Sequence, residues 1–132
     1  MPSELAHSKA AKFKTARSRL FNIDNGNGTT IDDTILVTTR PIRLHAARIV
    51  YTTETAGTVA AANAKIGTTV GGAEIVAATA YENSKTVGLT TAMTLVITYV
   101  GAGAFVSVRH TGIASTVAGE AYVELDYSLF DD

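Results

Sequence analysis

The sequence predicts an all-β protein, an antiparallel and jelly-roll-like β-sandwich of about eight strands with an extended N-terminal arm. Two observations carry this prediction. Thr, Val, Ile and Tyr dominate from Thr29 onward, and these side chains suit the half-buried, pleated surface of a sheet. Glycines divide the same region into short segments, roughly 8–12 residues apart, as in sandwiches and barrels.

Length and composition limit the protein to one folded domain. We assign this domain to residues 13–132 of the 132, after an arm that covers residues 1–12. Hydrophobic residues make up 46% and charged residues 17%, which is too apolar for a disordered chain. Tryptophan is absent and aromatic residues amount to 7%, so we expect a core built from Ala, Val, Ile and Leu.

The N-terminal region, residues 5–20, fits two local structures. Its apolar residues between Ala6 and Leu20 recur near helical spacing, and Ala, Lys and Arg favour a helix. Followed by the Gly- and Asn-rich residues Asp24–Gly28, the region also fits a strand, a hairpin turn and a second strand. We expect an arm as far as about Lys12 and an extended segment after it.

The segment 42–53 is expected to be a strand interrupted by a bulge. Ile42 and Leu44 share one face of an extended chain, whereas Ile49 and Tyr51 share the other face. A bulge or bend near Ala46–Ala47 would place both sets on a single core-facing side.

The remaining segments are read from the same alternation. Met93–Tyr99 alternates in polarity and is followed by the turn at Gly101–Gly103 and a segment at Val106–Val108, which predicts a β-hairpin. A second hairpin turn is expected at Gly71–Gly72. Further strands are predicted at Ile31–Thr39, Ala61–Thr68 and Ala73–Tyr81, with a short one near Thr86–Leu89.

The last strand, Glu120–Leu129, has the clearest pattern. Its apolar residues, from Ala121 to Leu129, occupy every second position and predict a core-facing side. The opposite side carries Glu120, Glu124 and Asp126. We interpret it as a solvated acidic face, because paired catalytic carboxylates require a cleft.

The sequence offers little for catalysis or metal binding, and we predict a protein that is not an enzyme and needs no cofactor or metal. It has no cysteine, which excludes a thiolate nucleophile and a Cys-based zinc site. The three histidines, His7, His45 and His110, lack the spacing of metal ligands. Gly-x-Ser-x-Gly does not occur. Asp24–Gly28 has glycine at the third and fifth positions, where a calcium loop needs side-chain oxygens, and it predicts a tight turn instead.

Charge is distributed unevenly along the chain. Residues 1–48 carry a net charge of +4 and residues 49–132 a net charge of −5. A basic first part can bind an acidic scaffold or a second copy of the chain, and the alternative is a solvated tail. Nucleic-acid binding is not expected, because aromatic residues are sparse in the basic part. No apolar run approaches about 20 residues, so we predict no membrane contact.

The chain resembles the capsid cement or decoration proteins of tailed bacteriophages that have a jelly-roll fold. The resemblance lies in length, composition and strand layout, and in the segments Lys9–Asn22, Lys65–Val76 and Arg109–Gly112. It implies a virion protein on the capsid exterior, with no catalytic residues, that forms a trimer or similar homo-oligomer and bridges neighbouring major capsid proteins. It also implies that the arm contacts the capsid. The predicted contact residues are Lys9, Lys12, Phe13, Lys14, Arg17 and Arg19.

A second hypothesis is a module that binds carbohydrate or a host surface, such as a head-fibre or tail domain. Jelly rolls include lectin domains, and tyrosines can stack on sugar rings. The lack of tryptophan counts against this hypothesis. The tyrosines that would supply such a surface are Tyr51, Tyr81, Tyr99, Tyr122 and Tyr127.

Overall fold

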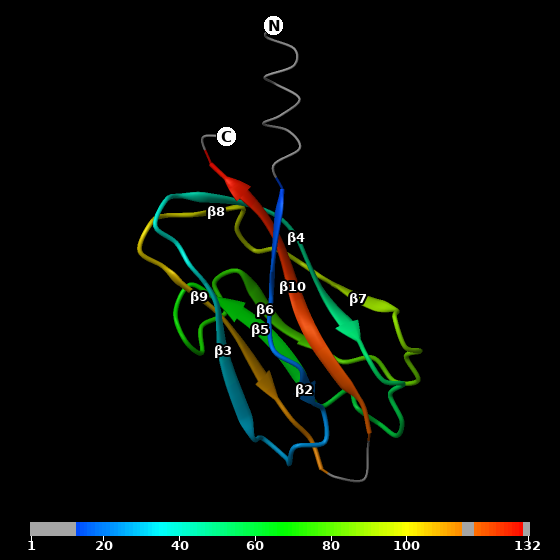
Figure 1. Cartoon of the computed structure of the whole chain (residues 1–132). Coiled ribbons are helices and arrows are strands. Elements are labelled where there is room, and N and C mark those ends of the chain that lie inside the picture. The colour runs from blue at the N-terminus through cyan, green and yellow to red at the C-terminus, as the bar shows by residue number, and fades with distance from the viewer. Residues whose placement is uncertain (1–12, 115–117, 131–132) are drawn as a thin grey trace, which may run out of the picture.

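The computed structural model describes residues 13–114 and 118–130, which form two antiparallel sheets packed face to face, as predicted (Figure 1). These described residues contain no α-helix, so the helical alternative for the N-terminal region is wrong from residue 13 onward. The rest of the predicted arm, residues 1–12, lies outside the described residues. The predicted boundary between the arm and the domain therefore stays a prediction.

The first sheet has four strand positions, and two of them are filled by two short strands in succession. β1 and β2 lie one after the other along β10, and β7 and β8 do the same along β4. From one edge to the other the strands are β1 (Lys14–Arg17) with β2 (Phe21–Asn22), β10 (Glu120–Leu129), β4 (Ile42–Tyr51), and β7 (Thr90–Met93) with β8 (Tyr99–Val100).

The second sheet has four strands and packs beneath the first (Figure 1). The hairpin of β5 and β6, with the glycine turn between its strands, was predicted and is confirmed. From one edge to the other the strands are β3 (Thr30–Val37), β9 (Phe105–Thr111), β5 (Asn63–Gly67) and β6 (Val76–Ala80).

The strand order is that of a jelly roll. With β1/β2 and β7/β8 each counted as one strand, the order is 1-8-3-6 in the first sheet and 2-7-4-5 in the second. In this numbering strand 1 pairs with strand 8, strand 2 with 7, strand 3 with 6 and strand 4 with 5. These nested antiparallel pairs are those of one long hairpin whose turn lies between strands 4 and 5. The contacts 8·3 and 7·4 then divide the hairpin into two sheets. The predicted fold class is confirmed, and the ten strands fill eight strand positions, in line with the predicted number of about eight.

The predicted bulge lies in β4 at His45, next to the predicted position. Leu44 pairs with Tyr127 and Ala46 pairs with Asp126, so His45 is the extra residue. Because the bulge reverses the alternation, Ile42 and Leu44 before it and Ala47, Ile49 and Tyr51 after it all face the core.

The core is mainly aliphatic, as predicted, but aromatic residues are among its largest members. Phe21, Tyr51 and Tyr81 are fully or almost fully buried. The Tyr51 hydroxyl accepts a hydrogen bond from the Glu82 backbone amide at 2.9 Å and lies 2.7 Å from the Thr91 hydroxyl. These partners offset the cost of burying a phenol oxygen.

One predicted hairpin is wrong. The residues after Met93 leave the regular sheet, and β8 pairs with β4, whereas β9 pairs with β3 and β5 in the other sheet. The turn at Gly101–Gly103 therefore crosses between the sheets. Thr38 holds it there, because its hydroxyl donates to the Gly101 carbonyl at 2.8 Å and accepts from the Ala104 amide at 2.8 Å. The expected strand near Thr86–Leu89 is a turn that leads into β7.

A close backbone approach makes Gly67 sensitive to substitution. A Cβ at this position would lie 2.5 Å from the Gly72 carbonyl carbon, whereas at Gly101 the nearest atom, the Tyr99 hydroxyl oxygen, is 4.0 Å away. We expect Gly67→Ala to lower the free energy of unfolding by about 1–3 kcal/mol through this overlap. Gly101→Ala is the control and should leave it unchanged or raise it by up to about 1 kcal/mol. Urea unfolding measures both, and equal effects would contradict the assigned loop packing.

Candidate interaction surface

The largest buried polar side chain among the described residues is that of His110 in β9. His110 is fully buried and its ring stacks on Phe21 at 5.1 Å between centroids. Its Nδ1 lies 2.7 Å from the Tyr81 hydroxyl, and its Nε2 lies 3.2 Å from Asn25 Oδ1. Since the amide oxygen can only accept, Nε2–H donates to Asn25 and Nδ1 accepts from Tyr81. His110 is thus a neutral core histidine that links β9 to two loops.

The surroundings of His110 indicate a structural role and not a catalytic one. Burial lowers the pKa of His110 to about 4 and raises the pKa of Tyr81 above its usual range. In the described residues every buried side-chain N or O atom has a hydrogen-bond partner. No group of three or more His, Asp or Glu side chains in residues 13–114 and 118–130 is arranged to hold a metal ion.

The outward face of the first sheet carries a network of charges across three strands. Glu124 in β10 accepts hydrogen bonds from Arg17 Nε and Nη2 in β1, at 3.1 and 2.6 Å. Arg48 in β4 reaches Glu124 at 3.2 Å and Asp126 at 2.8 Å. Asp126 also accepts a hydrogen bond from Thr15 in β1 at 2.8 Å. The predicted solvated acidic face is therefore wrong for Glu124 and Asp126, which are paired with arginines.

Of the predicted contact residues that the structure describes, Arg17 belongs to this charge network, whereas Phe13, Lys14 and Arg19 do not. Arg17 is tied to Glu124 and its guanidinium lies 4.6 Å from the centroid of the Tyr122 ring, so it holds β1 in the sheet. The side chains of Lys14 and Arg19 are exposed. Phe13 is 60% exposed and stacks on His45 at 4.1 Å. The other predicted contact residues, Lys9 and Lys12, lie outside the described residues.

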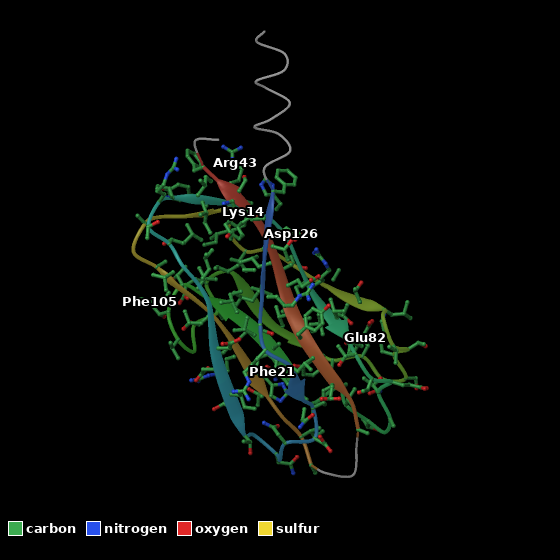
Figure 2. All side chains as sticks on the ribbon, viewed as in Figure 1. Lys14, Phe21, Arg43, Glu82, Phe105 and Asp126 are labelled. Carbon is green, nitrogen blue, oxygen red and sulfur yellow. The ribbon has the colours of Figure 1, made fainter. Side chains whose placement is uncertain are left out.

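An aromatic cluster that was not predicted from the sequence lies near residues 13 and 130, the two ends of the described chain. The rings of Tyr99 and Phe130 meet edge to face at 5.0 Å, and both are about half exposed. The Arg43 guanidinium lies 4.9 Å from the centroid of the Phe130 ring. Figure 2 shows Arg43 and Lys14 near this end of the molecule. No sequence motif marks the cluster, because its members come from β4, β8 and the residue after β10.

The tyrosines proposed as a sugar-stacking surface do not form one. Tyr51 and Tyr81 belong to the core, with ring centroids 6.3 Å apart. Tyr122 is covered in part by Arg17, and Tyr127 packs against the core from the other side of β10. Of the five, Tyr99 alone is exposed on the scale of a stacking platform.

Residues in the segment Arg109–Gly112, which contributed to the family resemblance, have structural roles. Arg109 forms a two-pronged pair with Asp32 in β3, at 2.7 and 2.9 Å, and these hydrogen bonds lower the pKa of Asp32. Gly112 lies against Asn25, where a Cβ would overlap the amide group. The segment therefore ties β9 to β3 and packs against the loop between β2 and β3.

Comparisons with known proteins give limited similarity. No protein-family model matches the chain, and no curated protein matches it. Among solved structures, one of infectious bursal disease virus, Gx strain, has a TM-score of 0.35 and 16% identity over 89% of this chain and 36% of that chain. One of the Gt strain has a TM-score of 0.29 and 13% identity over 90% of this chain and 41% of that chain. This chain thus spans less than half of those chains, and the jelly-roll assignment rests on strand order alone.

No helix among the described residues has the length and apolarity that crossing a membrane requires.

The buried histidine makes stability depend on pH. Between its unfolded pKa of about 6.5 and its folded pKa of about 4, the unfolded chain binds more protons at this site than the folded protein. Stability should therefore fall as the pH is lowered through this window, by up to roughly 3 kcal/mol from His110. His110→Gln should be less stable at neutral pH and should lose this part of the slope. Urea unfolding across the window measures both, and an unchanged slope in the variant would rule out His110 as the cause.

Proposed function

We propose that the protein is a structural component of a virus particle, and more narrowly a cement or decoration protein on the outside of a tailed-phage head. The observation that carries this proposal is the jelly-roll strand order. Jelly rolls build viral capsid domains and lectins, so the inference rests on a fold-level analogy. The contacts within the sandwich explain how such a role would work.

A cement protein needs a rigid body that transmits force from one capsid contact to another. β1 supplies the connection, because it pairs with β10 over four residues, Lys14 to Arg17. The side chains of Arg17 and Thr15 add hydrogen bonds to Glu124 and Asp126. Load applied to the chain before residue 13 would therefore pass directly into the central strands of the first sheet.

The proposed partner is the major capsid protein, through an acidic part of its outer surface. Lys14 and Arg19 present exposed cationic side chains, and Lys14 directly follows the exposed Phe13 in the sequence. Lys9 and Lys12 add positive charge to the same part of the sequence. Several copies joined as a homo-oligomer, for which the family resemblance implies a trimer, would bind more tightly than one copy through avidity.

A second candidate function, glycan binding, is favoured by the exposed Tyr99–Phe130 pair with Arg43 beside it. Aromatic rings of this kind can stack on sugar rings, and an arginine can bind hydroxyl or carboxylate groups. Binding to a glycan array that is lost in Tyr99→Ala, together with no binding to phage heads, would replace the capsid proposal with this one.

Removal of residues 1–12 tests the capsid role of the arm. We expect the truncated protein to keep its melting temperature, because the described sandwich is satisfied by contacts within residues 13–114 and 118–130. We also expect it to bind expanded heads of the parent phage at least about tenfold more weakly, because two lysines are lost. Co-sedimentation with heads that lack the protein measures the binding, and calorimetry measures the melting temperature.

A pair of charge-reversal variants provides a control for the binding measurement, one at Lys14 beside the arm and one at Lys65 away from it. Lys65 lies in β5, and Lys65→Glu should bind heads like the wild type, whereas Lys14→Glu should bind more weakly. A large fall in melting temperature on truncation would show that residues 1–12 belong to the fold. Failure of the wild-type protein to bind heads would refute the capsid role.

A further inference from the structure

The two flanks of the sandwich differ sharply in charge. On one flank, β1 and β3 lie at the sheet edges and carry charged residues, and the Arg19 amide donates to Asp33 Oδ2 at 2.7 Å across the gap. Charged side chains on an edge strand oppose pairing with another chain. This flank is therefore unsuited to edge-to-edge strand pairing with a second copy of the chain. Its charged residues are Lys14, Arg17, Arg19, Asp32 and Asp33.

The opposite flank, here called the neutral flank, consists of β6 (residues 76–80) and residues 86–100 with β7 and β8. It contains no charged residue and no proline, and the uncharged stretch of sequence runs for 23 residues, from 86 to 108. Its two parts are joined, because the Val96 amide donates to the Ile75 carbonyl at 2.7 Å. In the described part of the chain β6 pairs with β5 alone, and β7 and β8 pair with β4 alone.

Large aliphatic side chains project from the neutral flank. Val96 is 61% exposed, Val87 is 57% exposed and Leu89 is 51% exposed. Between them the surface is formed by small residues, Ala and Thr, which leave the backbone of the edge accessible. Two charged residues, Glu82 and Lys85, border the flank and neutralise each other in an ion pair at 2.6 Å. Glu82 also accepts a hydrogen bond from the Thr91 hydroxyl in β7 at 2.6 Å. Figure 2 shows Glu82 beside the end of β7.

We propose that the neutral flank binds a second copy of this chain. The lack of charge favours this occupant, because a charged partner surface would lose its hydration here without gaining an opposite charge, whereas a second neutral flank matches the first in polarity. Two neutral flanks meet without that cost and without like-charge repulsion. The net charge of −1 also leaves little long-range repulsion between copies. Burial of Val96, Val87 and Leu89 supplies the attraction.

This inference deepens the homo-oligomer part of the proposed function, and its test needs no phage head. Sedimentation of the full chain over a range of concentrations should give a mass above the 13.8 kDa of one chain. Val96→Lys and Leu89→Lys place a charge on the flank at exposed positions, so the fold is kept. Each should weaken association at least about tenfold. Leu20→Lys is the matched control, because Leu20 is 50% exposed between β1 and β2 on the other flank.

Hydrogen exchange of the wild type provides a second measurement that needs no variant. Amides of residues 86–98 and of β6 should become more protected as the protein concentration rises, while those of β3 should not. A wild type that stays monomeric, or an oligomer unaffected by Val96→Lys and Leu89→Lys, would overturn the inference. A monomer that binds heads would leave the proposed function standing, whereas an oligomer that ignores heads would refute only that function.

Discussion

The pairing of β10 with both of its neighbours is the constraint on which the rest of the fold depends. β10 lies between β1 and β4, and its ladder with β4 runs from the Ala121–Tyr51 pair to the Leu129–Ile42 pair. Because the jelly roll is a hairpin of nested pairs, the first and last strands must meet before the first sheet is complete. These contacts are distant in sequence, so their loop-closure entropy is offset only when the core between the sheets is buried.

The two faces of β10 then have separate tasks. Its inner face contributes Ala121, Val123 and Leu125, all fully buried, to the core. On its outer face, Glu124 connects arginines from the strands on either side. A single exposed ion pair contributes little stability, but a shared carboxylate fixes the register of three strands at once. The result is a body in which the N-terminal strand is held by backbone, core and surface contacts together.

Much of the fold could be predicted from alternation, because alternation reports which side of a strand meets the core. The phase slip after Leu44 predicted a bulge to within one residue of His45. Alternation does not report which strand lies alongside, and for that reason the segment ending at Tyr99 was paired with the wrong strand. The pairing of Arg17 with Glu124 was also out of reach, because it joins residues 107 positions apart that only the closed sheet brings together. The uncharged residues around Val96 are visible in the sequence. Only the order of strands in the two sheets shows that these residues and β6 lie on the same flank.

The central claim is that β1 belongs to the rigid body of the sandwich and can pass load from the preceding chain into it. Native-state hydrogen exchange of the full chain tests this claim most directly, because it gives the free energy of opening for each strand. The account predicts that the protected amides of β1 and of Ser18, which donates to the Val123 carbonyl at 2.9 Å, open with the same free energy as the β4–β10 ladder. Exchange of β1 by local fraying, at a much lower free energy than that ladder, would contradict it.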